Sequence, residues 1–227
     1  MRSIRNYGVA IVTAVLVTLR AYAQIPDDSL KIYAVNVVKT PPFRKQFTGD
    51  AIYLGNGLVI TAAHVIGHWP FFTRPRVLIA DQDLPAKILK EGSFEETDLV
   101  LLSIDDARLP MRLRLRRNPL CKRPPEIGAT VLDVATTGTD RVQIISPLTI
   151  MPELRRRLDS LISSPKGSGS GLFDNDYKCL VGIVSGEVPK YKYVTMNGRV
   201  IPTANGLAGF FVSAAKIADF IPAKFHF

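Results

Sequence analysis

Residues 55–65 read Gly-Asn-Gly-Leu-Val-Ile-Thr-Ala-Ala-His-Val, and the fold can be inferred outward from them. The Gly-Asn-Gly triplet separates two apolar runs, 49–54 and 58–61, which is a strong signal for a tight β-hairpin. The second strand of this hairpin runs directly into His64. A histidine in that position can act as a general base, since its ordinary pKa is near neutral, or it can be a buried structural residue. The histidine alone leaves both roles open.

A second stretch, residues 166–174, reads Lys-Gly-Ser-Gly-Ser-Gly-Leu-Phe-Asp. Glycines around a serine let the backbone turn tightly, so that the hydroxyl points outward while neighbouring N–H groups converge. That geometry suits a nucleophile beside an oxyanion hole, the group of donors that stabilises the negative oxygen formed in acyl transfer. The alternative is a flexible Gly/Ser loop.

A third stretch, residues 95–104, places Asp98 at the head of the apolar run Leu-Val-Leu-Leu. A carboxylate buried there could orient a histidine and stabilise its protonated form. Glu95 and Glu96 precede the strand and are expected to face solvent. Asp105 and Asp106 follow the strand and are typical turn residues.

Leu58–Val65 resembles the histidine motif of the chymotrypsin/trypsin-like serine peptidases, and Asp98 with its apolar strand resembles their aspartate motif. The likeness is strongest to the bacterial exported branch that includes the high-temperature-requirement proteases and the glutamyl endopeptidases. It covers roughly residues 31–221, and the order His64, Asp98, Ser168 matches the family's order. The resemblance implies an all-β fold of two six-stranded Greek-key β-barrels packed across a cleft, with a short C-terminal helix.

By the same resemblance, Ser168 is the nucleophile, His64 the general base and Asp98 the residue that orients His64. Ser168 fits the nucleophile position better than Ser170, because choosing Ser170 would put Leu172 where the family has a small residue. The resemblance implies a protein or peptide substrate. The sequence shows no pattern of metal-ligating residues, and we expect neither a metal nor a cofactor.

The oxyanion hole implied by the resemblance consists of the backbone N–H groups of Lys166, Gly167 and Ser168. Lys166 departs from the family, which has glycine there because glycine permits a backbone geometry that a side chain resists. Loss of one such donor costs about 2.7–4 kcal/mol of transition-state stabilisation. Four alternatives stay open: Lys166 tolerates the geometry, Gly167 takes up the turn, the hole forms only with substrate, or the protein is a weak or inactive pseudoprotease that binds protein or polyanion.

The resemblance also implies a substrate pocket walled by Ile162, Ser185, Gly186 and Glu187. Ile162 argues against selection of a basic substrate side chain, and an exposed Glu187 is favoured over an inward one. We therefore expect a small or apolar residue at the cleaved position. Many members of the family join the regions around Cys121 and Cys179, so the resemblance implies this disulfide.

The N-terminus has the pattern of a secretory signal peptide: two arginines, an apolar run over 8–19, and Ala-Tyr-Ala at 21–23. The run is shorter than the about 20 apolar residues that span a bilayer. Cleavage after Ala23 would lower the formal charge from +9 to +6 by removing three arginines. We expect an exported protein, periplasmic or secreted, that is a monomer. An oxidising compartment would favour one disulfide between the two cysteines.

The expected organisation is a signal peptide (1–23), a first barrel (24–110) with His64 and Asp98, a connection (111–125), and a second barrel (126–227) with Ser168. The connection is Pro-rich and basic, as domain boundaries often are. It shares with the residues just before it a run of cations: Arg108, Arg112, Arg114, Arg116, Arg117, Lys122 and Arg123.

Alternation of arginine with Met111, Leu113 and Leu115 predicts an edge strand in this connection with its charged face in water. The alternative is a face for an anionic partner, at Arg112–Arg123. No aromatic residue interleaves the arginines, as single-strand nucleic-acid binders require, so the solvated face is favoured.

Further strands are expected over 31–38, 76–80, 86–89, 128–135, 141–145, 179–185 and 207–212. Met196-Asn197-Gly198 predicts a second tight hairpin between 191–195 and 199–201. Segment 154–161 is expected to be a short helix or a charged loop. Ser213 can cap a final helix over 214–221, whose apolar face would be Ile217, Phe220 and Ile221.

Overall fold

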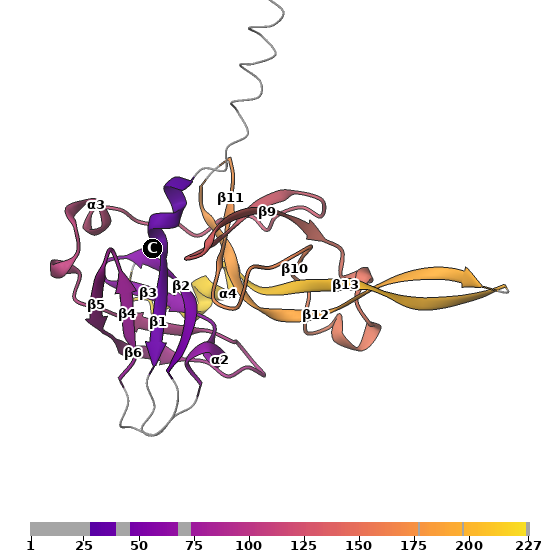
Figure 1. Cartoon of the computed structure of the whole chain (residues 1–227), viewed down its shortest axis with the longest axis horizontal. Coiled ribbons are helices and arrows are strands. Elements are labelled where there is room, and N and C mark those ends of the chain that lie inside the picture. Colours follow the sequence, from indigo (N-terminus) through magenta and orange to yellow (C-terminus); the bar gives the residue numbers. More distant parts are fainter. Residues whose placement is uncertain (1–27, 40–45, 68–73, 177, 197, 226–227) are drawn as a thin grey trace, which may run out of the picture.

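The structure is a computed structural model that describes residues 28–39, 46–67, 74–176, 178–196 and 198–225. The expected signal peptide (1–23) lies outside the described residues. Most of the regular secondary structure of the described residues lies in two antiparallel sheets, and helices are few and short (Figure 1). No helix in the described ranges is long and apolar enough to cross a membrane.

The first sheet has seven strands in the spatial order β5-β4-β1-β2-β3-β7-β6. A 3-10 helix, Asp28–Tyr33, leads into it. Its strands are β1 (Ala34–Lys39), β2 (Phe47–Gly55), β3 (Leu58–Thr61), β4 (Arg76–Ile79), β5 (Gln82–Pro85), β6 (Lys87–Glu91) and β7 (Val100–Ser103). The sheet is open between β5 and β6, and β5 is a strand that the sequence did not predict.

The hairpin between β2 and β3 forms at the predicted place. Gly55, Asn56 and Gly57 all have positive φ (106°, 53° and 70°), a conformation that favours glycine and asparagine. A Cβ on Gly57 would lie 2.5 Å from the carbonyl oxygen of Ile104. The turn therefore needs glycine for both backbone conformation and space, and it fixes the register that leads β3 into His64.

The second sheet closes into a six-stranded barrel in the order β10-β13-β12-β11-β8-β9. Its strands are β8 (Thr130–Ala135), β9 (Gly138–Ile145), β10 (Leu161–Ile162), β11 (Gly171–Asp174), β12 (Leu180–Met196) and β13 (Arg199–Ser213). The expected strands around 179–185 and 191–195 are one continuous strand, and so are those around 199–201 and 207–212. Together β12 and β13 form a long ribbon that extends away from the barrel (Figure 1).

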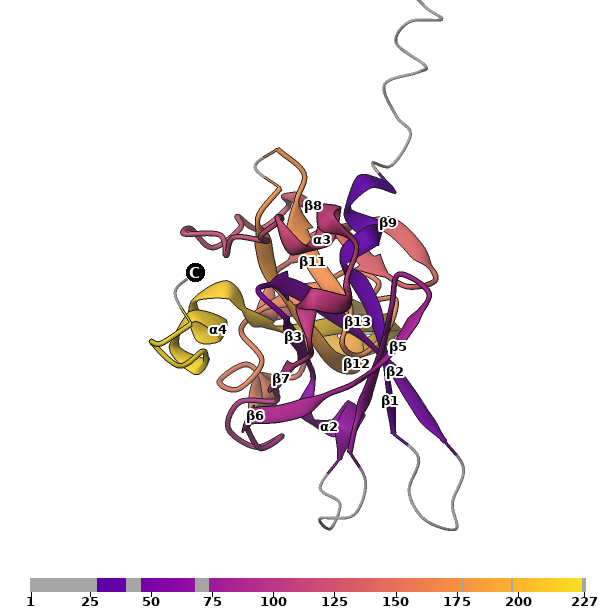
Figure 2. The same cartoon turned by 90° about the vertical axis from the view of Figure 1, so that its left-hand side faces the viewer.

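One large cluster of buried apolar residues draws on both sheets, and two smaller clusters lie in the second half of the chain. Ile52 from β2 packs in the same cluster as Leu132 from β8 and Phe173 from β11. Figure 1 shows the two sheets side by side, and Figure 2 shows the C-terminal helix α4 (Ala214–Phe220) at one flank of the molecule. Ile217 and Phe220 of this helix are buried, as predicted, although the Ser213 side chain makes no capping hydrogen bond.

The connection between the sheets corrects one prediction. Residues Met111–Arg114 form a single helical turn, α3, instead of an edge strand. The N–H groups of Leu113 and Arg114 both donate to Pro110 O, and only Leu113 is buried. Proline at the start of the turn favours this conformation, and the exposed Met111 and Leu115 have no apolar face to join.

The predicted disulfide is present between Cys121 and Cys179. It lies beside a parallel bridge of Leu120 with Leu180, where Cys121 N donates to Leu180 O (2.9 Å). The end of the connection is thereby fastened to the first residue of β12, the strand that leads to Ser185.

Candidate active site

His64 and Asp98 meet because β3 and β7 pair antiparallel, with Thr61 opposite Val100. His64 lies three residues after Thr61, on the short helix α2 (Ala63–Ile66), and Asp98 lies two residues before Val100. Both side chains therefore reach the same end of the sheet. His64 Nδ1 is 2.6 Å from Asp98 Oδ2, and the His64 backbone N–H donates to Asp98 Oδ1 (3.0 Å).

The Asp98 carboxylate is buried, with 5% of its side chain exposed, whereas His64 is 37% exposed. Burial alone would raise the pKa of Asp98, but hydrogen bonds from His64 and Ser185 outweigh it and hold that pKa below its ordinary value. The Ser185 hydroxyl donates to Asp98 Oδ2 (2.5 Å). An ionised Asp98 favours the imidazole form with its proton on Nδ1, which leaves Nε2 free to accept a proton.

Ser168 lies in the loop between β10 and β11 and is half-buried. Its hydroxyl donates a hydrogen bond to Ser185 O (3.0 Å). The structure describes both Ser168 and His64, and no hydrogen bond joins the two side chains. Ser170 is fully buried, and its hydroxyl donates to Gly167 O (2.9 Å). Of the two serines in the loop, only Ser168 has access to solvent.

Gly169 fastens this loop to the first sheet. Its φ is +89°, and its N–H donates to Val184 O (2.8 Å). A Cβ there would overlap Asp50 O and lie 2.6 Å from Thr61 Oγ1. Thr61 Oγ1 donates a hydrogen bond to Asp50 O (2.6 Å), so the two atoms against which Gly169 packs hold each other in place. Thr61 also precedes His64 by three residues, and the contact thus sets Ser168 relative to His64.

Lys166, the residue that departs from the family pattern, makes an unexpected contact. Its backbone N–H donates to Asp133 Oδ2 (2.7 Å), and its ammonium pairs with Asp140 Oδ2 (2.7 Å). Asp133 lies on β8 and is fully buried. Burial raises the pKa of Asp133 to about 6, against the opposing effect of the Ser170 hydroxyl and of the backbone N–H and ammonium of Lys166.

The three predicted oxyanion-hole donors are therefore not equivalent. The Lys166 N–H is occupied by Asp133, while those of Gly167 and Ser168 have no hydrogen-bond partner among the described residues. Sequence analysis did not single out Asp133. The available signal was an aspartate inside the otherwise apolar strand 128–135, where a charged residue is seldom fully buried without a role.

The residues expected to form the walls of the substrate pocket differ in their surroundings. Ile162 is fully buried, and a Cβ on Gly209 would lie 2.8 Å from its Cγ1 and 2.7 Å from Pro165 Cβ. Ile162 and Pro165 thus occupy the space over Gly209. Glu187 is exposed, as predicted, and Ser185 is directed at Asp98.

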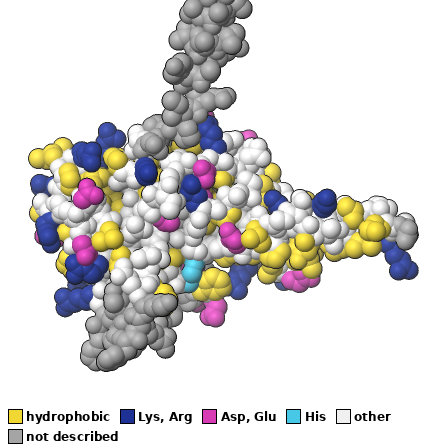
Figure 3. Space-filling model, in the orientation of Figure 1, with side chains coloured by type: hydrophobic (Ala, Val, Ile, Leu, Met, Phe, Trp, Pro, Cys, Tyr) yellow, Lys and Arg dark blue, Asp and Glu magenta, His cyan; other side chains and the backbone are white. Residues whose placement is uncertain are grey.

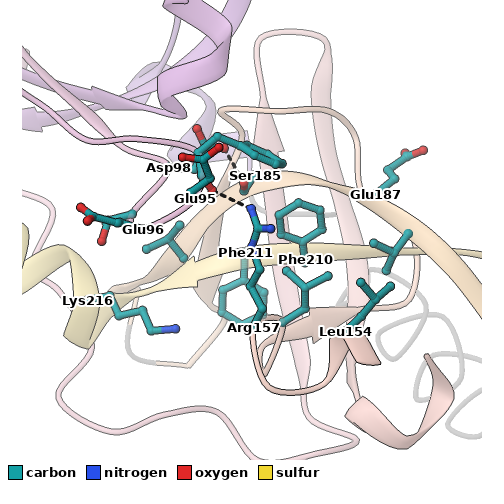
Figure 4. Close-up of a pocket in the computed structure, with 15 residues that line it drawn as sticks. Glu95, Glu96, Asp98, Leu154, Arg157, Ser185, Glu187, Phe210, Phe211 and Lys216 are labelled. Carbon is teal, nitrogen blue, oxygen red and sulfur yellow. Dashed lines mark hydrogen bonds between the residues drawn. The ribbon is translucent and has the colours of Figure 1, made fainter. Parts of the chain in front are cut away.

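A cavity of about 250 Å³ opens beside Asp98 (Figure 4). Phe94 packs edge-on against His64 with ring centroids 5.9 Å apart. Arg157 donates to Phe94 O (3.0 Å) and lies 5.1 Å from the Phe94 ring centroid. The cavity is lined by four separate segments, which is why the sequence did not reveal it: residues 94–98, 154–158, 185–188 and 210–216.

No protein-family model and no curated protein sequence matches the chain. Solved structures do match. The active form of the Rv3671c protease from M. tuberculosis has a TM-score of 0.56 and 18% identity, over 85% of this chain and 80% of its own. A kallikrein-related peptidase 10 in complex with Zn²⁺ has a TM-score of 0.59 and 18% identity, over 89% and 98%. An inactivated protease paralogue of the scabies mite has a TM-score of 0.54 and 15% identity, over 86% and 94%.

These similarities extend over most of the chain, 85% of it in one case and 89% in another. At 15–18% sequence identity, these similarities are evidence for the fold alone. The chain therefore has the fold of the chymotrypsin-like serine proteases.

Proposed function

We propose that this protein is a serine endopeptidase that cleaves peptide bonds with Ser168, His64 and Asp98. The observation that carries the proposal is the pairing of His64 with the buried Asp98 through two hydrogen bonds, together with a solvent-accessible serine in a glycine turn. The same carboxylate also accepts a hydrogen bond from the Ser185 hydroxyl. A structural histidine would need neither an ionised partner with this geometry nor a free Nε2.

In the proposed reaction, the Ser168 hydroxyl leaves Ser185 O by rotation about its Cα–Cβ bond and turns toward His64. Ser168 Oγ attacks the scissile carbonyl while His64 Nε2 takes its proton. The proton passes to the leaving amine as the C–N bond breaks, which leaves an ester on Ser168. Water, deprotonated by His64, then hydrolyses the ester, and Asp98 stabilises the imidazolium in both halves.

The negative oxygen of each tetrahedral intermediate would be held by the Gly167 and Ser168 N–H groups. Lys166 can contribute only when its N–H leaves Asp133. A missing donor of this kind lowers the rate by about a hundredfold or more. The proposed enzyme is therefore slow in the conformation described, and faster where the Lys166 peptide can turn.

The proposed substrates are proteins or peptides with a small or apolar residue before the cleaved bond, since Ile162 and Pro165 occupy the space over Gly209. We also propose that residues 1–23 are a signal peptide and that the protein works in a periplasm or outside the cell. The Cys121–Cys179 disulfide fits an oxidising compartment.

A second candidate function is a pseudoprotease that binds protein without cleaving it. Two observations favour it: Ser168 donates to Ser185 O instead of His64, and Asp133 occupies the Lys166 N–H. One of the similar structures is described as an inactivated protease paralogue, so this fold accommodates inactive chains.

Labelling with a fluorophosphonate probe separates the two functions, because such probes react with a serine activated by a base and an oxyanion hole. The protein from Gln24 onward would be compared with Ser168→Ala and Ser170→Ala. Labelling that is lost in Ser168→Ala and kept in Ser170→Ala is expected. Absence of labelling in the wild type, with a folded protein by circular dichroism, would favour the pseudoprotease.

A further inference from the structure

The ribbon of β12 and β13 continues beyond the cavity as an arm, which we define as residues 189–196 and 198–207 (Figure 1). Each strand of the arm pairs with the other, from Pro189 opposite Leu207 to Met196 opposite Arg199, and with no third strand among the described residues. About 3.3 Å per residue gives the arm a length of roughly 25 Å. A hydrogen bond from Arg155 Nη2 to Tyr193 OH (3.4 Å) ties it to the barrel.

An isolated two-stranded ribbon is marginally stable in water. This one also exposes large apolar side chains. The exposed fractions are 49% for Tyr193, 58% for Met196, 66% for Val200, 42% for Ile201 and 51% for Leu207. Figure 3 shows hydrophobic side chains along the arm, with basic ones among them. A surface of this kind indicates a contact with something outside the chain.

The strand register distributes the apolar residues over both faces of the arm. Opposite residues of an antiparallel pair share a face, and successive residues alternate. One face therefore carries Val194 with Ile201, and Met196 with Arg199. The other carries Tyr193 with Pro202, and Thr195 with Val200. The end of the arm is thus an apolar wedge and not a ribbon with one apolar side.

The charge of the arm has one sign. Residues 189–207 contain Lys190, Lys192 and Arg199 and no acidic residue. Lys192 and Arg199 are exposed, and Lys190 is half-buried. The complementary surface is therefore anionic as well as able to receive apolar side chains.

We propose that the arm is a membrane-docking element that enters the headgroup layer of an anionic lipid bilayer. A bilayer can surround a wedge with apolar residues on both faces, whereas a protein surface would cover one face and leave the other in water. Tyr191 and Tyr193 lie on the barrel side of the wedge, at the level where tyrosine is enriched in membrane interfaces. Arg199, beside the turn, has phosphate groups as its partners.

Docking would also position the cleft. Glu187 and Val188, at the root of the arm in β12, and Phe210 in β13 line the cavity next to Asp98. A docked arm would hold this cavity about one arm length from the lipid surface. The site would then act on polypeptide segments close to a membrane. The docking itself does not depend on peptidase activity and is tested separately from it.

The test is co-sedimentation of the protein from Gln24 onward with vesicles of phosphatidylcholine, alone or mixed equally with phosphatidylglycerol. We expect binding to the mixed vesicles at low salt, and weaker binding at high salt. The double variant Met196→Asp/Val200→Asp should bind at least about tenfold more weakly. The triple variant Lys190→Glu/Lys192→Glu/Arg199→Glu should bind roughly a hundredfold more weakly.

Matched controls use surface residues elsewhere. Arg112→Glu/Lys122→Glu/Arg123→Glu changes the charge equally at the connection, and Leu148→Asp replaces an apolar residue exposed to the same 66% as Val200. Both controls should bind as the wild type does. The tryptophan fluorescence of the variant Val200→Trp should shift to shorter wavelength with mixed vesicles, and that of Leu148→Trp should not.

Three results would overturn the proposal. The first is that the wild type fails to bind mixed vesicles at low salt. The second is that the arm variants bind as well as the wild type. The third is that the connection variant loses binding while the arm variants keep it. Retention on heparin that depends on the three arm cations, without vesicle binding, would instead assign the arm to an anionic polymer. Circular dichroism of every variant shows whether a loss of binding reflects a loss of fold.

Discussion

The backbone N–H of Lys166 donates to the buried carboxylate of Asp133 at 2.7 Å. In the fold of this chain, that N–H belongs to the loop that would have to stabilise the reacting oxygen. Asp133 Oδ1, the other oxygen of the carboxylate, is buried without a hydrogen-bond partner of ordinary geometry among the described residues. This hydrogen bond therefore couples a buried carboxylate on β8 to the ability of the serine loop to stabilise the reacting oxygen.

Asp133 should make the folded state less stable as pH rises. Its pKa is about 6 in the folded state against 3.8 as the ordinary value, so the folded protein binds the proton more tightly. Stability therefore falls as pH rises from about 4 to above 6, by roughly 3 kcal/mol in all. Asp133→Asn, which keeps an acceptor for Lys166, should remove this loss and be more stable than the wild type at pH 7.5. Urea denaturation at pH 4 and pH 7.5 measures the difference. An equal pH dependence in both proteins would contradict the assignment.

Lys166→Gly should raise the rate of acylation by a fluorophosphonate. Glycine removes the side chain that resists the backbone rotation, so the N–H can leave Asp133 and face the oxyanion. We expect an increase of about tenfold to a hundredfold, measured as the second-order labelling rate. Lys166→Ala is the matched control: it also removes the ion pair with Asp140 but retains Cβ, and its rate should stay near that of the wild type. Equal acceleration in both variants would assign the effect to the ion pair.

Ser185→Ala should destabilise the protein at neutral pH more than in acid. The Ser185 hydroxyl donates to the buried Asp98, and loss of a hydrogen bond to a charged group costs about 1.5–3 kcal/mol. The lowered pKa of Asp98 contributes stability above its ordinary value of 3.8, which is lost as pH falls through the lower folded-state pKa. The variant should thus approach the wild type in stability at low pH. A pH-independent difference in urea midpoint would indicate that the hydroxyl matters for packing alone.

Gly169→Ala should destabilise the protein by about 3 kcal/mol or more and abolish probe labelling, because the new Cβ overlaps Asp50 O and presses on Thr61 Oγ1. The control variant Gly206→Ala separates the effect of steric crowding from the effect of backbone strain. Gly206 has nearly the same φ, +84° against +89°, and nothing within 4 Å of its Cβ position. Its replacement should cost only about 1 kcal/mol. Thermal unfolding of both variants gives the comparison, and equal losses would mean that strain, not the contact with the first sheet, makes glycine necessary.

The sequence alone was sufficient for features set by local chemistry. Gly55-Asn56-Gly57 specified a turn through its backbone conformations, and the strand it begins placed His64 at its end. The motifs at His64, Asp98 and Ser168 and their order predicted the two-sheet fold, and the resemblance they carry predicted the Cys121–Cys179 bond. Local chemistry also explains the edge strand that was wrongly predicted in the connection, because Pro110 precedes a helical turn where alternation favoured a strand.

Tertiary structure decided whatever depends on register and on closure of the barrel. Asp133 and Lys166 are 33 residues apart, and they meet because β11 pairs with β8 and carries the serine loop over that strand. Gly169 meets Thr61 and Asp50 only where the two sheets pack. The arm was not predicted, because the sequence suggested four short strands where the structure has the two long strands β12 and β13. Periodicity and turn signals act over a few residues, whereas these contacts are fixed by the burial of one core shared between both sheets.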